Sequence, residues 1–278
     1  MSKGVEVRGL RMVYQGRGRS VEALADLSFP VEASELVCVV GPSGCGKTTM
    51  LRCIVGLLEP TAGEVLLGGA RVAGPPPGMA VVFQEYGRSL FPWMTARANV
   101  ELPLRARRLP GRRRDELVSE ALAAVGLGDV GGAYPWQLSG GMQQRVAIAR
   151  AVAYEPHVLL MDEPFAAVDA QTRAELEDLV RSLWRRTGVT IVFVTHDIDE
   201  AVYLGERVLV MSSSPTVVQD DRAVDLPGER DQLTTRSDAR FTRLRTHVYA
   251  QIREAKRDEG RAAPPPPSPE GAAAAPGT

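Results

Sequence analysis

Two acidic residues, Asp162 and Glu163, follow the apolar run Val158–Met161. A run of this length is typical of a buried strand, and two carboxylates at its end could hold a hydrated cation and an attacking water. Upstream, Ser139–Gly141 opens a predicted helix, whose free backbone N–H groups and dipole favour phosphate. Together, the two features predict hydrolysis of a nucleotide.

A second motif supplies a phosphate-binding loop. It reads Gly41-Pro42-Ser43-Gly44-Cys45-Gly46-Lys47-Thr48-Thr49 and lies between the apolar run Leu36–Val40 and a helical pattern that extends to Leu58. Glycines let the backbone curl around a polyphosphate, Lys47 adds a mobile charge, and the Thr48 hydroxyl can ligate Mg²⁺. The chain has 33 basic residues, of which only Lys3, Lys47 and Lys256 are lysines. The strand and helix on either side disfavour the alternative of a chance glycine-rich turn.

The order of these motifs resembles the ATP-binding subunit of an ABC transporter over roughly residues 5–225. The resemblance implies that Tyr14 stacks on adenine and that Gln84, after the predicted strand Ala80–Phe83, is the glutamine of the Q-loop. It also implies that Asp169 is the D-loop aspartate and His196 the switch histidine. A lone tyrosine or histidine beside a strand is more often a packing residue, so these assignments depend on the whole series of motifs.

The resemblance further implies a mechanism. Glu163 would orient or deprotonate the water, His196 would contact the γ-phosphate, and Asp162, Thr48 and Gln84 would hold Mg²⁺. A second copy of the chain would close its helix start over the ATP, so that two copies enclose two ATP molecules. The residues expected to act across this dimer are Ser139, Gly140, Gly141 and Gln143.

Two positions depart from the family pattern. Met142 precedes Gln143 where the family usually has glutamine directly after the two glycines, and Ala166 replaces a serine of the D-loop. The first departure puts a side-chain contact from this position to the nucleotide in doubt. The backbone donors of the helix start are unaffected.

Composition agrees with a soluble globular protein that works with separate membrane subunits. The 278 residues are 44% hydrophobic and 24% charged, with a net charge of −1 that gives no general attraction to nucleic acid. The three cysteines, Cys38, Cys45 and Cys53, lack CxxC spacing, which indicates a reducing compartment. No signal peptide or membrane span is visible. We therefore expect a peripheral location on the cytoplasmic face of the cell membrane.

The expected partners are two transmembrane permease subunits and, indirectly, an extracytoplasmic solute-binding protein. The candidate permease contact is the segment Tyr86–Trp93, although Phe91 and Trp93 could instead be core residues of the helical insert. Residues 83–93 and 225–241 together resemble the branch of importers for nitrate, sulfonates such as taurine, and related small anions. Uptake of a thiamine precursor or bicarbonate stays open.

The pattern of elements predicts an α/β fold: a P-loop NTPase core of the ABC type with an antiparallel β subdomain and an inserted α-helical subdomain. We expect the ATP-binding domain over residues 1–225, with the helical subdomain at about 86–155. A helical extension follows over 226–258, with Phe241, Leu244, Val248 and Ile252 at helical spacing. Residues 259–278, rich in Pro and Ala, are expected to be disordered.

Two other functions deserve weight. A non-transport ABC ATPase acting on nucleic acid or ribosomes would typically have a long coiled-coil insertion or two cassettes, and a P-loop kinase would have no use for the second glycine motif. Six arginines crowd residues 105–114, a density sometimes found in nucleic-acid sites. No aromatic residues interleave them, so they are more typical of a solvated loop and no nucleic-acid partner is expected.

Overall fold

The computed structural model describes residues 3–16, 19–84 and 89–262. Within them, ten strands form one sheet in the order β5-β4-β1-β2-β10-β9-β3-β8-β7-β6. The strands are β1 (Val5–Gly16), β2 (Arg19–Val31), β3 (Leu36–Val40), β4 (Ala62–Leu67), β5 (Ala70–Arg71), β6 (Met79–Val82), β7 (Val158–Asp162), β8 (Thr190–Val194), β9 (Arg207–Met211) and β10 (Thr216–Ala223).

The central strands β3, β8, β7 and β6 run parallel, with Leu36 paired to Ile191 and Val158 to both Thr190 and Met79. Every residue of β3, β7 and β8 is buried, which explains why these strands read as short apolar runs. Parallel strands end at the same edge of a sheet. The phosphate loop, the two acids and His196 therefore all emerge at one edge.

The other half of the sheet is antiparallel. β1 pairs with β2 through Val5 and Val31, and with β4 through Val5 and Leu67. The predicted antiparallel subdomain is thus confirmed. β9 and β10 were not predicted; β10 reads TVVQDDRA, a largely polar sequence that pairs antiparallel with β9 and briefly parallel with β2.

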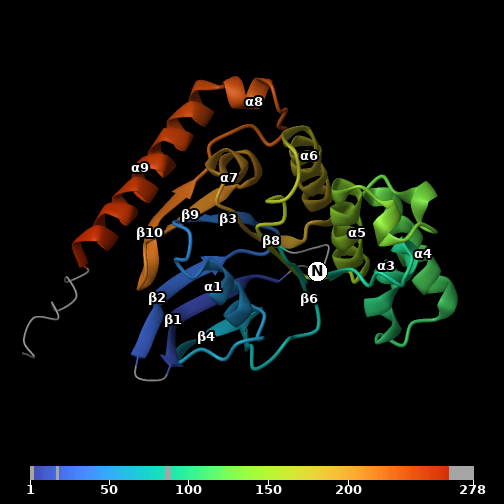
Figure 1. Ribbon diagram of the computed structural model, residues 1–278, viewed down its shortest axis with the longest axis horizontal. Helices are drawn as coiled ribbons and strands as arrows, with labels where there is room; N and C mark the ends of the chain where they lie inside the picture. Colours follow the sequence, from blue (N-terminus) through green and yellow to red (C-terminus); the bar gives the residue numbers. More distant parts are fainter. Residues whose placement is uncertain (1–2, 17–18, 85–88, 263–278) are drawn as a thin grey trace, which may run out of the picture.

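Helices cover both faces of the sheet and build a separate layer at one end (Figure 1). The helices of the ATP-binding region are α1 (Lys47–Ile54), α3 (Ala96–Arg105), α4 (Gly111–Ala124), α5 (Gly140–Ala153), α6 (Ala170–Thr187) and α7 (Ile198–Leu204). α1 packs with the antiparallel strands over one core, and α5, α6 and α7 pack over the other. The inserted layer of α3, α4 and α5 confirms the predicted α-helical subdomain.

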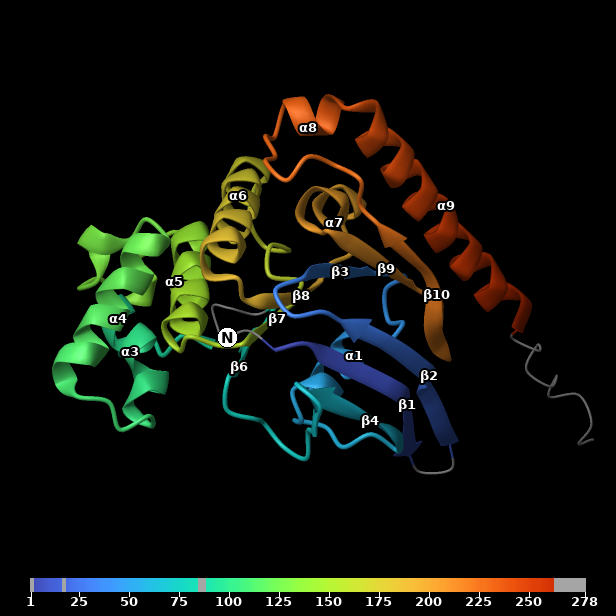
Figure 2. The same ribbon diagram turned by 180° about the vertical axis from the view of Figure 1, so that it is seen from behind.

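The chain after residue 225 returns across the molecule and ends in a long helix (Figure 2). The short α8 (Thr234–Ser237) precedes α9 (Ala239–Ala262), which packs Phe241 and Val248 into the core. Asp238 accepts a hydrogen bond from the Arg240 amide at 2.7 Å, as expected of a residue that starts a helix. α9 continues four residues beyond the predicted end at residue 258. The rest of the Pro/Ala-rich tail lies outside the described residues.

Candidate nucleotide site

The phosphate loop connects β3 to α1. Gly44 and Gly46 have φ of +80° and +101°, conformations that favour glycine, and Gly46 directly precedes the first turn of α1. The Lys47 side chain folds back over the loop, and its Nζ donates to the carbonyl oxygens of Gly41 and Pro42, each at 2.9 Å. Lys47 is only 5% exposed. Its ammonium group is therefore held inside the loop, beside the backbone N–H groups that could cradle phosphate.

Asp162 and Thr48 form the part of the site that fits a divalent cation. The Thr48 hydroxyl hydrogen-bonds to the Asp162 carboxylate, and Asp162 Oδ1 is buried without a hydrogen-bond partner. Burial raises the pKa of Asp162, while the Thr48 hydrogen bond and the nearby Lys47 oppose this rise. A buried carboxylate oxygen that lacks a partner, next to a hydroxyl, is a donor set that suits Mg²⁺.

No group of three or more His, Cys, Asp or Glu side chains in the described part of the chain could hold a metal ion. The candidate protein ligands for a cation are therefore the Asp162 carboxylate, the Thr48 hydroxyl and the Gln84 side chain, beside the oxygens of a bound phosphate. Such a small set of protein ligands is typical of Mg²⁺ in nucleotide sites.

Two side chains that follow the strands on either side of β7 converge on the carboxylate of Glu163. Glu163 Oε2 lies 3.0 Å from His196 Nδ1 and 3.4 Å from Gln84 Nε2. Glu163 adopts φ of +43°, an uncommon conformation for a residue with a side chain, and its amide donates to the Val194 carbonyl at 2.9 Å. Backbone strain of this kind is concentrated at functional sites. The structure thus brings Glu163 and His196, predicted to handle the water and the γ-phosphate, together with Gln84, predicted as a catalytic residue and a ligand of Mg²⁺.

Tyr14 comes from β1 and lies beside the same loop. Its hydroxyl is 3.1 Å from Thr49 Oγ1, and the residue is 40% exposed. A partly exposed ring next to the start of α1 is placed where a base could stack on it. This exposure excludes a position in the core, whereas packing on the surface is still compatible with it.

The second glycine motif starts α5. The Ser139 side chain caps the helix by accepting a hydrogen bond from the Met142 amide at 3.3 Å. A Cβ added to Gly141 would lie 2.4 Å from Thr172 Cγ2, so the contact between α5 and α6 requires glycine here. No hydrogen bond or ion pair between described residues joins this helix start to the phosphate loop of the same chain.

Gln143 has a structural role that the sequence did not reveal. Its Nε2 donates to the carbonyl oxygens of Pro135 at 2.9 Å and Leu138 at 3.2 Å. The side-chain amide therefore ties α5 to the loop that precedes it. This arrangement leaves the backbone of the helix start, and the Ser139 hydroxyl, as the groups best placed to meet a nucleotide.

Asp169 caps α6, as a D-loop aspartate would. Its carboxylate accepts hydrogen bonds from the Thr172 amide at 3.0 Å and the Thr172 hydroxyl at 2.7 Å. These bonds lower the pKa of Asp169. The D-loop backbone is therefore fixed at the start of α6.

Sequence reasoning missed Asn99, which fixes the turn after the Q-loop. Asn99 is fully buried, accepts from the Phe91 amide at 2.8 Å, and donates to the carbonyl oxygens of Phe91 and Met94, each at 3.1 Å. Trp93 on this turn is 68% exposed and its ring lies 5.3 Å from that of Phe91. Trp93 is thus not a core residue. Residues 85–88 of the predicted permease contact lie outside the described chain.

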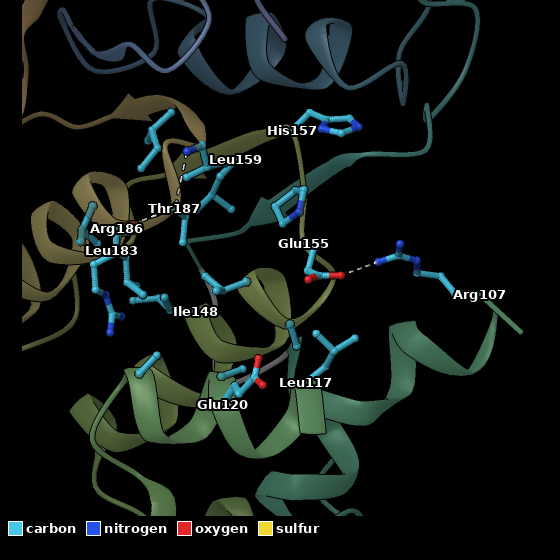
Figure 3. A pocket seen from close by; sticks show the side chains of 18 residues that line it. Arg107, Leu117, Glu120, Ile148, Glu155, His157, Leu159, Leu183, Arg186 and Thr187 are labelled. Atoms are coloured by element: carbon cyan, nitrogen blue, oxygen red, sulfur yellow. Dashed lines mark hydrogen bonds and ion pairs between the residues drawn. The ribbon is translucent and has the colours of Figure 1, made fainter. Parts of the chain in front are cut away.

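A cavity of about 670 Å³ lies between the helical layer and the parallel strands (Figure 3). Its wall is mixed, and the apolar part includes Leu117, Ala124, Ile148, Leu159, Leu183 and Ile191. Charged side chains, among them Arg107, Glu120 and Glu155, lie at its edge. The cavity adjoins the amino-terminal ends of β7 and β8, whereas the candidate nucleotide site follows their carboxyl ends.

Comparison with known proteins decides the family. Residues 24–166 match the ABC transporter family. The chain is also 45% identical over 227 residues to a nitrate import ATP-binding protein of Synechocystis sp., covering 82% of this chain and 85% of the relative. The chain belongs to the ABC transporter ATP-binding family. A taurine import ATP-binding protein of Roseobacter denitrificans is 45% identical over 213 residues, covering 76% and 79% of the two chains.

A solved structure supports the same assignment for this ABC ATPase. The solved structure is a dimeric ATP-binding cassette in a post-hydrolysis state with ADP and Pi, and it is 33% identical to this chain with a TM-score of 0.71. The match covers 98% of that structure's chain and 79% of this chain. The predicted fold class and ATPase activity are therefore confirmed. No helix among the described residues is long and apolar enough to cross a membrane.

Proposed function

We propose that this ABC ATPase hydrolyses ATP between two copies of itself and thereby drives import of a small anion through separate membrane subunits. The main observation is the convergence of Gln84, Glu163 and His196, which gather at the edge of the sheet where the phosphate loop begins. Relatives named for nitrate and taurine import support the transport part of the proposal.

The chemistry is assigned as follows. Glu163 orients or deprotonates the attacking water, and His196 contacts the γ-phosphate while its Nδ1 faces Glu163. Lys47 and the loop amides bind the phosphates. When bound between Asp162, Thr48 and Gln84, Mg²⁺ would neutralise charge on the phosphate oxygens. Tyr14 supplies a surface for adenine.

The proposed dimer is based on the separation, within one chain, of the phosphate loop from the helix start at Ser139. The Ser139 helix start makes no polar contact with the phosphate loop of its own copy, and the dimeric cassette that resembles this chain carries ADP and Pi. We propose that Ser139, Gly140 and Gly141 complete the site of the partner copy through backbone donors, and that Gln143 contributes by holding this helix start in place.

Mixing two defective copies tests the dimer. Lys47→Ala and Ser139→Ala chains, each inactive alone, should together form heterodimers that contain one intact site and one doubly defective site. ATPase activity should return to roughly a quarter of the wild-type value in an equal mixture, since half of the dimers would be mixed and each would have one working site. Activity that stays at the level of the separate variants would contradict shared sites.

The permease contact is proposed at the turn carrying Phe91 and Trp93 and, as a second surface, at the cavity between the helical layer and the parallel strands. Asn99 and Arg150 anchor this turn, since Arg150 Nη1 donates to the Ser89 carbonyl at 2.6 Å. A fixed turn with an exposed tryptophan and a cavity with a charged rim suit an amphipathic helix from a membrane subunit. Such a partner supplies the membrane span that the described chain lacks.

Two neighbouring residues of α4 provide a matched test of the cavity. Ala124 lines it and Ala123 does not, and Ala123 is exposed. Ala124→Phe should reduce recovery of permease subunits from detergent-solubilised membranes, whereas Ala123→Phe should not. Both purified variants should keep wild-type ATP binding. Equal permease recovery with the two variants would exclude the cavity as the contact.

The substrate proposal is a small anion of the nitrate, sulfonate or taurine type, delivered by an extracytoplasmic solute-binding protein. Location at the cytoplasmic face of the membrane follows from the proposed partners. Reconstitution with the permease subunits and binding protein tests both points, because the correct solute should stimulate ATP hydrolysis. Lack of stimulation by any of these anions would reject the substrate class.

The non-transport alternative finds no support in the arginine-rich segment. Arg105 and Arg114 pair with Glu101, Arg112 pairs with Glu116, and Arg113 pairs with Glu155. These ion pairs offset part of the positive charge of the segment, which disfavours a free basic surface. Recovery of nucleic acid or ribosomes with the purified chain would favour the alternative.

A further inference from the structure

We propose that Arg173 is a positioning residue that couples the D-loop to the switch histidine. The inference rests on the proposed function, because it assumes that Asp169 meets the partner copy and that His196 acts at the γ-phosphate. Arg173 lies one turn into α6, and its amide donates to the Asp169 carbonyl at 2.9 Å. Nothing in the motif pattern of the sequence singles out this residue.

The guanidinium group of Arg173 joins two segments that lie far apart in the sequence. Nη1 donates to Asp197 Oδ2 at 3.1 Å, and Nη2 lies 3.5 Å from the carbonyl oxygen of Val168. Val168 belongs to the D-loop, and Asp197 directly follows His196. A planar group with donors on two arms can reach both acceptors at once, which a lysine ammonium on a single stem does less well.

Asp197 is itself held firmly, so it can transmit the position of Arg173. Its Oδ1 accepts from the amides of Asp199 at 2.9 Å and Glu200 at 3.1 Å, which caps α7. Its own amide donates to Thr195 Oγ1 at 3.0 Å. The other carboxylate oxygen, Oδ2, accepts the hydrogen bond from Arg173. In the part of the chain that the structure describes, Arg173 is the only ion-pair partner of Asp197. His196 therefore sits between two fixed residues, Thr195 and Asp197.

Buried acidic side chains around Asp197 favour the positive charge of Arg173 at this position. Glu200 is 4% exposed and Glu177 is 1% exposed. Burial raises the pKa of both carboxyl groups, and the negative charge of Asp197 adds to that rise. Arg173 opposes this effect at Glu200. The Nε atom of Arg173 is buried without a hydrogen-bond partner. The guanidinium group is therefore oriented by the Val168 carbonyl and Asp197, and its Nε makes no hydrogen bond in this orientation.

The consequence is a direct route from the dimer seam to the reacting groups. A shift of the D-loop moves the Val168 carbonyl, Arg173 passes the shift to Asp197, and the backbone of His196 moves with it relative to Glu163. Loss of the link should therefore slow hydrolysis without weakening ATP binding. A small misplacement of a catalytic group is enough to lower turnover strongly.

The test compares Arg173→Gln with Arg185→Gln, a change to another arginine of α6 that is 48% exposed and pairs with the exposed Glu229. Arg173→Gln should lower kcat by roughly 10- to 100-fold with unchanged Kd for ATP and unchanged Tm. In a Glu163→Gln background it should still form the ATP-bound dimer. Arg185→Gln should match wild type in every measurement.

A double-mutant cycle tests the coupling itself. Asp197→Asn keeps the helix cap but removes the charge that faces Arg173, so it should lower kcat to a similar extent, and the double variant should be no slower than either single one. The proposal would be overturned if the losses in kcat of the two single variants multiplied in the double variant, or if Arg173→Gln retained wild-type kcat. It would also be overturned if Arg173→Gln lowered Tm and ATP binding as much as it lowered kcat. If Glu163→Gln itself retained turnover, the catalytic role proposed for Glu163 would fail instead.

Discussion

His196 Nδ1 lies 3.0 Å from Glu163 Oε2, although the two residues are 33 positions apart and follow different strands. Gln84 Nε2 approaches the same oxygen at 3.4 Å. The carboxylate is therefore oriented by groups from both neighbouring strands rather than left free in solvent. This arrangement gives the catalytic assignments specific consequences.

Glu163→Gln should bind ATP but turn over about 10²- to 10⁴-fold more slowly, because the amide cannot accept a proton from water. Size-exclusion chromatography with ATP should show a persistent dimer. Glu59→Gln, at an exposed glutamate, is the control and should behave like wild type. Full turnover in Glu163→Gln would remove this residue from its assigned role.

Lys47→Ala should weaken ATP affinity by at least about 30-fold, since a charge-assisted contact with phosphate contributes 2 kcal/mol or more. Lys47→Arg should not restore it, because the planar guanidinium does not fit where the ammonium contacts the carbonyl oxygens of Gly41 and Pro42. Calorimetric titration with ATP measures both effects. Wild-type affinity in Lys47→Arg would show that charge alone is required.

Gly141→Ala should destabilise the protein by about 1–3 kcal/mol, because the new methyl group meets Thr172 Cγ2 at 2.4 Å. Thr172→Ser removes that methyl group and keeps the hydroxyl bonded to Asp169, so the double variant should regain stability. Chemical unfolding gives the free energies. Gly128→Ala, where nothing lies within 4 Å of the added Cβ, is the control. A double variant as unstable as Gly141→Ala alone would exclude this contact as the cause.

Glu200 should make stability depend on pH. Burial raises its pKa from 4.5 to about 8, so the folded state binds this proton more tightly than the unfolded state. Its contribution is fully present below pH 4.5 and is lost as pH rises through about 8. Between pH 5 and 8, the free energy of unfolding should fall less steeply with pH in Glu200→Gln than in wild type. The two slopes should differ by up to about 1 kcal/mol per pH unit.

Glu229→Gln, at a glutamate whose side chain is 88% exposed, provides the comparison for that measurement. Its pH profile should run parallel to that of wild type. If the Glu200→Gln profile were also parallel, Glu200 would not titrate in this range. Measurements at low salt and at 0.5 M salt would separate the local effect from general surface charge.

The sequence predicted best where structure is local and apolar. β3 begins and ends where its apolar run predicted, β7 extends one residue past the run Val158–Met161, and β6 is displaced by one residue from the expected Ala80–Phe83. β10 was missed because its polar residues pair with partners that only the folded chain brings near. Strand pairing of this kind has no signature within a short window of sequence.

The candidate site was likewise predictable in its motif residues and not in its long-range contacts. Motif spacing predicted the phosphate loop and the two acids, and the family resemblance implied Gln84 and His196. The structure brings Gln84, Glu163 and His196 within hydrogen-bonding reach. The contacts of Gln143 with Pro135 and Leu138 were not predictable, since they depend on how the loop turns before α5. The link between Arg173 and Asp197 likewise depends on the packing of α6 against α7.

The burial of Lys47 makes the chain well suited to chemical footprinting. Lys3 and Lys256 are exposed, and these three are all the lysines that the chain contains. An amine-reactive reagent would therefore label the two outer lysines and the chain terminus readily and the loop lysine slowly. Mass spectrometry of one peptide would then report occupancy of the loop, without any radiolabel or engineered probe.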